Sequence, residues 1–286
     1  MTEKPLTAAG YLPEHTRRVR ETCLYVATKL GDLLEDLVVV GGLVPSLLID
    51  QQHLPAGAEP HAGTMDLDLG LAFALVGQKR YQEVAERLRR AGFTPDVNAE
   101  GRPTRQRWRI SEPPVTVDFL VEPEDALAKA GRVFDLERDF AAIIAPGVHL
   151  AFEDRSRVTL SGVTIQGEST SRELWVCGPG AFIVLKALAF HLRGENKDAY
   201  DLFYVTRNYG AAVADVAARL RPLLVASIAK KAMECLKGDF LEPDATGPRR
   251  VAEFVRGRVD VNLQAEVVAF VRRLVDECER LSSSRP

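Results

Sequence analysis

Two aspartates, Asp66 and Asp68, stand two positions apart in a segment that alternates polar and apolar residues from Thr64 to Leu71. Such alternation is typical of a β-strand. Residues at i and i+2 of a strand point to the same face, with Cβ atoms about 7 Å apart. Two carboxylates at that separation can bind one hard divalent cation. We therefore expect Asp66 and Asp68 to be metal ligands.

A third carboxylate, Asp118, lies in a run of β-forming residues from Val115 to Val121. Burying a carboxylate without a partner is costly, so a cation is its natural neighbour. Two metal ions about 3.5–4 Å apart are the usual arrangement for in-line nucleotidyl transfer. If the two strands adjoin, Asp118 completes a catalytic, metal-binding set with Asp66 and Asp68.

A glycine pair, Gly41-Gly42, ends a short apolar run and precedes a helical pattern. Glycine lets backbone N–H groups approach phosphate oxygens at the start of a helix. Each feature alone has a structural reading: the glycines as a turn, the two aspartates as the exposed face of an edge strand. Their order along the chain, with the single-aspartate strand last, favours a phosphate-transfer site.

A second group of charged residues surrounds Lys186, which interrupts a helix that is otherwise apolar almost all round. Arg193 follows about two turns later on nearly the same face, and Asp198 and Asp201 share one face of the next helix. A lysine on a buried helix extends to the surface or meets an anion, and phosphate is one such anion. The alternative is structural: Lys197 pairs with Asp201, and Asp198 pairs with Lys186 or Arg193.

Hydrophobic periodicity predicts the elements that position these residues. The pattern changes near residue 175, so we expect an α/β domain over 1–175 and a helical domain over 176–286. The expected strands are 37–40, 64–71, 104–110, 115–121 and 158–166, the last with a turn at Ser161-Gly162. The expected helices of the first domain are 13–34, 43–49 and 78–91, and helical patterns follow one another from residue 180 onward.

The composition is that of a globular protein. The 286 residues are 46% hydrophobic and 27% charged, which excludes disordered, fibrous and small disulfide-rich classes. The four cysteines are far apart and form no C-x-x-C, as expected of reduced thiols. No long apolar run and no secretory signal are found, so we expect a cytoplasmic protein without a membrane partner.

The glycine pair together with TMDLDL, VDFLV and LKALAFHLRGENKDAYDL resembles the AbiEii/AbiGii-type nucleotidyltransferase toxins, which belong to the DNA polymerase β-like nucleotidyltransferase superfamily. The resemblance covers most of residues 36–207. It implies an α/β (α+β) nucleotidyltransferase core with a mixed sheet, followed by an all-α C-terminal domain. The wider superfamily usually has Gly-Ser where this chain has Gly41-Gly42, so no serine hydroxyl is present there to hold a phosphate.

The resemblance also implies residue roles. Asp66 and Asp68 would be the metal carboxylates, and family members differ in whether they retain a third, the place of Asp118. The triphosphate would be held by Gly41 and Gly42, and Lys186 would contact the nucleotide. Further residues of the implied nucleotide site are Thr64, two residues before the first aspartate, and Arg193, Lys197, Asp198 and Asp201.

The implied activity is a Mg²⁺-dependent transfer, with Mn²⁺ as a substitute, of NMP from an NTP to an acceptor hydroxyl. The expected acceptor is a tRNA 3′ end, and the chain would be the toxin of a type IV-like toxin–antitoxin pair whose antitoxin is encoded nearby. Candidate acceptor-surface residues are Arg105, Arg107, Arg109, Lys230, Lys231, Arg249 and Arg250.

Two other functions remain open at this point. The acceptor hydroxyl could belong to a protein or to a small molecule such as an antibiotic, which the net charge of −3 mildly favours. The chain could instead be a non-enzymatic regulator that binds nucleotide.

Overall fold

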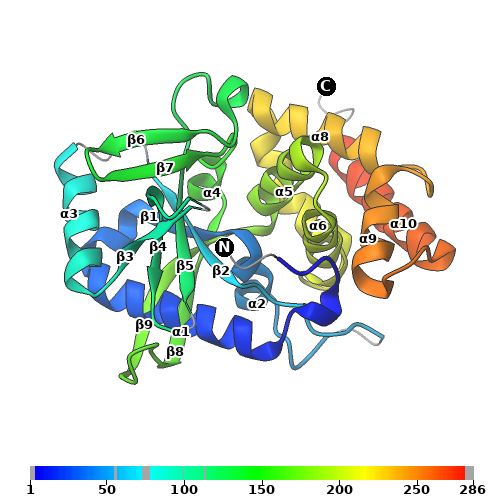
Figure 1. Ribbon diagram of the computed structural model, residues 1–286. Helices are drawn as coiled ribbons and strands as arrows, with labels where there is room; N and C mark the ends of the chain where they lie inside the picture. Colours follow the sequence, from blue (N-terminus) through cyan, green and yellow to red (C-terminus); the bar gives the residue numbers. More distant parts are fainter. Residues whose placement is uncertain (1–3, 55–56, 73–77, 99, 113, 281–286) are drawn as a thin grey trace. The chain divides into compact units, whose positions relative to one another are not determined.

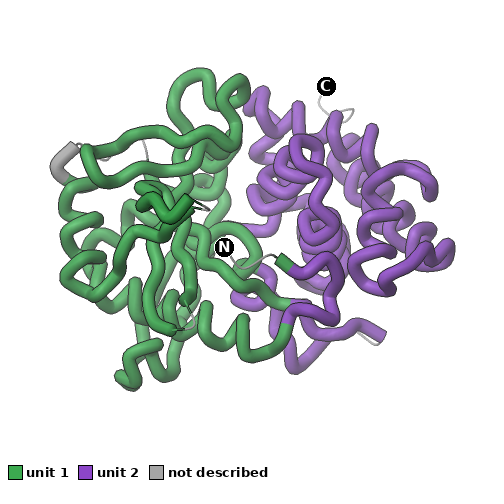
Figure 2. Tube along the Cα trace, in the orientation of Figure 1, with its two compact units in different colours: residues 1–4, 12–44, 63–177 green, residues 5–11, 45–62, 178–286 purple. Residues whose placement is uncertain are grey.

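A computed structural model describes residues 4–54, 57–72, 78–98, 100–112 and 114–280. These residues form two compact units (Figure 2). Unit 1 takes the described residues of segments 1–4, 12–44 and 63–177, and unit 2 those of 5–11, 45–62 and 178–286. Two short N-terminal segments therefore belong with the helices of the C-terminal part of the chain.

Unit 1 is built on one mixed β-sheet (Figure 1). Strands follow one another in the order β3-β4-β5-β2-β1-β9-β8, and β7 pairs with both β5 and β6. The strands are β1 Leu37–Val40, β2 Asp66–Leu71, β3 Thr94–Val97, β4 Pro103–Ile110, β5 Val115–Val121, β6 Val133–Glu137, β7 Phe140–Ile144, β8 Arg155–Val163 and β9 Ser169–Cys177. The pair β2–β5 is parallel, and β2 pairs antiparallel with β1 on its other side.

The central strands alternate between an apolar and an acidic face. Leu67 and Leu69 of β2 pair in register with Val117 and Phe119 of β5, and all four are buried. Helix α1, Pro13–Leu30, covers this face, because Val26 of α1 and Leu69 line the same small cavity. The intervening aspartates point to the opposite face, as the two-residue period of a strand requires.

Short helical elements complete unit 1. Helix α3, Gln78–Arg90, packs against α1 and against β6 and β7. The expected helix over 13–34 ends at Leu30, because Gly31 has φ +56° and ends the helix. The other short helical elements of unit 1 are α4 Leu150–Glu153 and the 3₁₀ turns Gly31–Asp36, Gly41–Leu43 and Ala126–Lys129. Helix α2, Val44–Leu48, begins at the last residue of a unit 1 segment, and its other residues belong to unit 2.

Unit 2 is helical. Its α-helices are α5 Pro179–Arg193, α6 Asn196–Asn208, α7 Val213–Leu220, α8 Ser227–Phe240, α9 Thr246–Arg256 and α10 Val261–Glu279. Helix α5 is apolar nearly all round and packs against α6, α7 and α8, which explains its burial. It ends at Gly194, where φ is +67° and the N–H bonds back to Phe190. A two-residue connection then leads directly into α6.

The expected layout of a mixed α/β part followed by several helices is confirmed. One strand prediction was wrong in detail. The turn does not fall at Ser161-Gly162, since both residues lie within β8; it falls at Thr164–Gly167, where Gly167 N–H bonds to the Thr164 carbonyl at 2.8 Å. Strands β3, β6, β7 and β9 were not predicted. In the described part of the chain, no helix has the length and apolar character needed to cross a membrane.

Candidate metal centre and a buried polar network

The sheet brings the three predicted carboxylates together. Asp66 and Asp68 lie on β2, and Asp68 stands beside Asp118 of β5 in the parallel register. One carboxylate oxygen from each of the three lies within 4.8 Å of the others. Asp66 and Asp118 are buried and Asp68 is half-buried. The reading of these aspartates as the exposed face of an edge strand was wrong, because β2 is flanked by β1 and β5.

Asp118 has a protein cation as its partner. Arg107 stands opposite Asp118 in the antiparallel β4–β5 pair, and its guanidinium binds the carboxylate through two bonds, Nε–Oδ1 at 2.7 Å and Nη2–Oδ2 at 2.5 Å. The hydrogen bonds to Asp118 raise the pKa of Arg107 above its usual value, and the nearby charges of Asp66 and Asp68 raise it further. Arg107 therefore lies beside the acidic triad of Asp66, Asp68 and Asp118, and its expected contact with an acceptor stays a prediction.

Asp66 is held by two groups from other parts of unit 1. The Lys4 ammonium lies 2.5 Å from Asp66 Oδ2, and the Thr64 hydroxyl donates to Oδ1 at 3.0 Å. Burial would raise the pKa of Asp66, but the Lys4 charge and these hydrogen bonds outweigh burial, so the pKa is lowered. Asp66 is therefore ionised at neutral pH.

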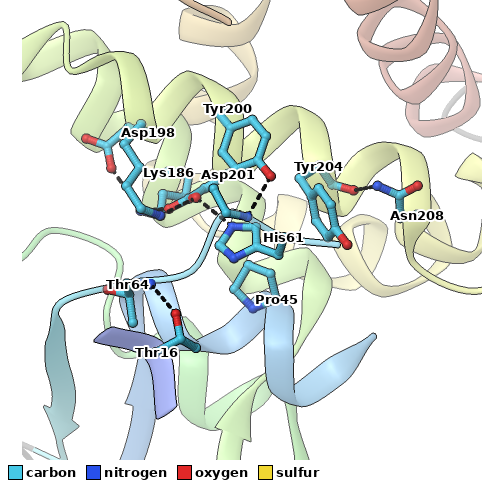
Figure 3. A network of polar contacts seen from close by, with 12 residues as sticks. Thr16, Pro45, His61, Thr64, Lys186, Asp198, Tyr200, Asp201, Tyr204 and Asn208 are labelled. Atoms are coloured by element: carbon cyan, nitrogen blue, oxygen red, sulfur yellow. Dashed lines mark hydrogen bonds and ion pairs between the residues drawn. The ribbon is translucent and has the colours of Figure 1, made fainter. Parts of the chain in front are cut away.

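Thr64 also fixes the entry to β2. Its backbone N–H donates to the Thr16 hydroxyl of α1 at 3.0 Å (Figure 3). The preceding Gly63 has φ +96°, and a Cβ there would lie 1.9 Å from the same hydroxyl oxygen. Thr64 thus orients Asp66 from within unit 1, and its implied contact with nucleotide stays a prediction.

Gly41 makes room for the triad. It follows the last residue of β1, Val40, which pairs with Asp68. Gly41 has φ +70°, and a Cβ there would lie 1.9 Å from Asp68 Oδ2. Glycine is therefore required at this position both by backbone conformation and by the closeness of the carboxylate. The predicted role of Gly41 and of the buried Gly42 in holding a triphosphate stays a prediction.

A second polar cluster, here called the Lys186 network, lies within unit 2 (Figure 3). The Lys186 ammonium bridges two carboxylates of α6, at 2.8 Å from Asp198 Oδ1 and 2.7 Å from Asp201 Oδ2. All three side chains are buried. Burial lowers the pKa of Lys186, but the two carboxylates outweigh it and raise the pKa above its usual value. Lys186 therefore stays charged and joins α5 to α6.

Two further cations complete this network. Arg193 binds Asp198 through Nε–Oδ2 at 2.6 Å and Nη2–Oδ1 at 2.9 Å. Lys197 lies 2.7 Å from Asp201 Oδ1. The structural pairing left open by the sequence is thus observed, and Asp198 pairs with both Lys186 and Arg193. The Arg193 side chain is 58% exposed against 10% for Lys186, so an anion can reach Arg193 far more easily.

Sequence reasoning missed His61, which joins the same network. Its imidazole is buried between Tyr200 and Tyr204, and Nε2 lies 2.9 Å from Asp201 Oδ1. Burial lowers the pKa of His61 to about 4, although Asp201 opposes the shift. The ring is therefore neutral at pH 7, and Nε2–H donates to Asp201. No local pattern could reveal this contact, because the two residues are 140 positions apart.

The other expected acceptor-surface cations lie in ion pairs or on exposed surface. Arg105 lies 2.8 Å from Asp135, and Arg109 lies 3.9 Å from Asp96. In unit 2, Lys231 pairs with Glu234 and Arg250 with Glu253. Lys230 and Arg249 are exposed.

A scan against models of known protein families found no match for this chain, and a search of curated proteins found none either. We therefore infer function from the residues and their geometry.

Proposed function

We propose that this chain is a divalent-metal-dependent nucleotidyltransferase of the AbiEii/AbiGii type. The observation that carries the proposal is the convergence of Asp66, Asp68 and Asp118, whose oxygens lie within 4.8 Å of one another. Carboxylate oxygens are the ligands that Mg²⁺ and Mn²⁺ prefer. Three of them around one point, two of them buried, fit such an ion.

In this proposal Asp66 and Asp68 hold the metal and Asp118 serves as the third ligand. A bound divalent cation supplies neutralisation of phosphate charge and lowers the pKa of a coordinated hydroxyl. Thr64 keeps Asp66 oriented, and Gly41 leaves the space that Asp68 occupies. Arg107, held by Asp118, adds a fixed positive charge beside the carboxylates, suited to a polyphosphate.

The Lys186 network supports the proposal in a modified form. Lys186 uses its charge on Asp198 and Asp201, so its first role is to fix α5 against α6. Arg193 carries the more exposed charge of the network and is the better candidate for contact with the nucleotide. Phosphate binding through a guanidinium held by a carboxylate is a common arrangement.

The reaction follows from the substrates. The acceptor hydroxyl gives its proton to solvent water, and its oxygen attacks the α-phosphorus of the NTP. A new O–P bond forms while the bond from the α-phosphorus to the bridging oxygen of the β-phosphate breaks, so that pyrophosphate leaves with that oxygen. Charge neutralisation and in-line positioning supply most of the rate in reactions of this class. The acceptor we propose is a tRNA 3′ end, in keeping with the family resemblance of the motifs.

The test follows the label from each NTP, labelled at its α-phosphate, in a mixture of purified protein, total RNA and Mg²⁺. We expect label in RNA, lost in Asp66→Asn and Asp68→Asn. Asp135→Asn, which removes an exposed carboxylate of the same sheet, is the matched control and should keep full activity. Label in protein or in a small molecule would instead identify the other acceptor classes. NTP binding by calorimetry without any transfer would favour the non-enzymatic regulator and overturn the proposal.

The proposed toxin role has a separate test. Induced expression should arrest growth of the host, and Asp66→Asn should relieve the arrest at equal protein level. Co-expression of the gene adjacent to this one should also relieve it if that gene encodes the antitoxin. Arrest that persists in Asp66→Asn would separate toxicity from the acidic triad.

A further inference from the structure

Lys4 places its ammonium against one of the three carboxylates of the proposed metal site. Its Nζ lies 2.5 Å from Asp66 Oδ2, an oxygen of the acidic triad. The Asp66 side chain is 9% exposed, whereas that of Lys4 is 59% exposed. The mostly solvated side chain of Lys4 thus places its positive charge next to the buried carboxylate of Asp66.

The two cations at the triad differ in how firmly they are held. Arg107 is part of β4, stands opposite Asp118 in register and makes two bonds to it. Lys4 lies outside any helix or strand, and its side chain, which pairs with Asp66, is 59% exposed against 24% for Arg107. The Lys4 ammonium is already mostly solvated, so its release requires little change in its hydration. The cost of release lies at buried Asp66, and a bound divalent cation would supply that carboxylate with a new counter-charge. Lys4 can therefore leave the site far more easily than Arg107.

Charge balance favours such a departure when a metal binds. The three carboxylates with Arg107 and Lys4 carry one net negative charge. A divalent cation added beside Lys4 would leave one net positive charge at partly buried groups, which is unfavourable. Replacing Lys4 by the divalent cation gives a neutral site.

We propose that Lys4 and the divalent cation exchange at Asp66, so that this lysine occupies the metal site in the metal-free protein and lowers its affinity for metal. The inference rests on the proposed metal site and goes beyond it, because it assigns control of metal loading to a residue outside the triad. Asp66 keeps a cationic partner in both states. The Lys4 ammonium is released only in the metal-bound state.

The first experiment measures binding of Mn²⁺ by electron paramagnetic resonance, without any nucleotide. Lys4→Met keeps a similar length without the charge, and we expect it to bind Mn²⁺ about three- to tenfold more tightly than wild type. Lys4→Arg should bind as wild type does. Lys29→Met, which removes a charge elsewhere in unit 1, is the matched control and should differ by less than about twofold. Asp66→Asn should abolish the binding.

The second experiment reads Lys4 directly in the wild-type protein, so it needs no variant to fold. Reductive methylation is followed by peptide mass spectrometry with and without Mg²⁺. We expect Mg²⁺ to raise the modification rate of Lys4 at least threefold, with exposed Lys230 unchanged as the internal reference. In Asp66→Asn, Lys4 should react fast whether or not Mg²⁺ is present.

The outcomes separate this inference from the proposed function. If Mn²⁺ binds and depends on Asp66, but Lys4→Met binds no tighter, the exchange is wrong and the metal site stands. Tighter binding by Lys4→Met with no change in Lys4 reactivity would mean that the lysine acts at a distance, which also overturns the exchange. If neither wild type nor Lys4→Met binds Mn²⁺, the metal site itself fails, and the proposed function with it.

Discussion

At the scale of single residues, Asp118 shows how a sheet can keep a carboxylate buried. Its side chain is 4% exposed, and its counter-charge comes from Arg107 on the adjacent strand, which is 24% exposed. Removing one partner of such a pair leaves an uncompensated charge in a poorly solvated place. The pair is thus a structural requirement of the triad, whatever ligand the triad binds.

Arg107→Met should therefore destabilise the protein. We expect a loss of about 2–3 kcal/mol in the free energy of unfolding, below the range for fully buried pairs because Arg107 is partly solvated. Arg105→Met removes an exposed arginine of the same strand and should cost no more than about 0.5 kcal/mol. Denaturant unfolding checks both. Equal stability of the two variants would contradict the prediction.

Substitution of Gly41 gives a sharper prediction, because the effect of the backbone conformation and the effect of the added Cβ can be measured separately. Gly41→Ala meets both the left-handed backbone, at φ +70°, and a Cβ contact of 1.9 Å with Asp68 Oδ2. Gly92 has φ +85° and nothing within 4 Å of an added Cβ, so Gly92→Ala meets the backbone constraint alone. We expect about 1 kcal/mol of destabilisation for Gly92→Ala and clearly more for Gly41→Ala.

Metal binding should distinguish the two glycine variants further. Gly41→Ala must displace the Asp68 carboxylate, so the affinity for Mn²⁺ should fall at least tenfold. Gly92→Ala should leave it unchanged. A Gly41→Ala protein that binds Mn²⁺ as tightly as wild type would show that Asp68 is not a ligand.

The buried imidazole of His61 predicts a dependence of stability on pH. Its pKa is about 4 in the folded protein against about 6.5 in an unfolded chain. The unfolded state therefore binds more protons between these values, so stability is fully present above pH 6.5 and is lost as the pH falls toward 4. From pH 7 to pH 5 the expected loss is about 2 kcal/mol.

His61→Gln should flatten this part of the stability curve. The Lys186 network does not oppose the slope there, because Asp198 and Asp201 have lowered pKa values and stay ionised above pH 5. His149 acts at higher pH. Because Glu122 raises the pKa of His149, the stability that this histidine contributes is present below about pH 6.5 and is lost as the pH rises above the raised pKa. Denaturant unfolding at several pH values checks the difference between wild type and His61→Gln. An unchanged slope in the variant would assign the loss to other groups.

At the scale of elements, the α5–α6 pair separates a structural role from a binding role. Lys186→Met leaves Asp198 and Asp201 buried with one fewer cation, and we expect about 3 kcal/mol of destabilisation. Arg193→Met removes a mostly exposed partner of Asp198 and should cost about 1 kcal/mol or less. Lost activity in Lys186→Met alone would therefore say little about nucleotide contact.

Calorimetric measurement of nucleotide binding distinguishes contact with the nucleotide from a purely structural role. If Arg193 contacts the phosphates, Arg193→Met should weaken NTP binding at least tenfold while the thermal midpoint shifts by only a few degrees. Arg207→Met, which removes a partly exposed arginine paired with Glu266 on α10, is the matched control on α6. Equal NTP affinity in wild type and Arg193→Met would remove Arg193 from the proposed site.

The same scale shows which elements the sequence could predict. Strand β5 was placed to the residue because four of its seven side chains are both buried and β-forming. Strand β9 was missed because exposed polar residues alternate along its first half, and Gly162 in β8 was mistaken for a turn although it pairs with Thr170. Hydrophobic periodicity detects burial, so strands with little burial escape it.

The residues of the candidate site also differ in whether the sequence could predict them. Strand alternation alone could predict that Asp66 and Asp68 share a face, whereas the Arg107–Asp118 pair also needs the register between strands. Lys4 and Asp66 are 62 positions apart, and no pattern around Lys4 marks it as a partner. Tertiary folding, not local periodicity, therefore sets the contacts of Arg107 and Lys4 with the triad.

At the scale of the whole molecule, a net charge of −3 gives no broad attraction to RNA, so any RNA contact must come from local clusters. Lys230 and Lys231 form the exposed pair of lysines on α8. If they contact phosphates, the logarithm of the RNA affinity should fall linearly with the logarithm of salt concentration. Lys230→Gln/Lys231→Gln should then reduce that slope by about 1–2.

Lys129→Gln/Arg132→Gln is the control for this measurement, since it removes the same charge from exposed residues of unit 1. Filter binding of tRNA from about 50 to 200 mM salt gives both slopes. If the two double variants reduce the salt-dependence slope equally, Lys230 and Lys231 contribute to RNA binding only through the net charge of the protein. Without any salt dependence in wild type, phosphate contacts are too few for an RNA acceptor, and a protein or small-molecule hydroxyl becomes the better candidate.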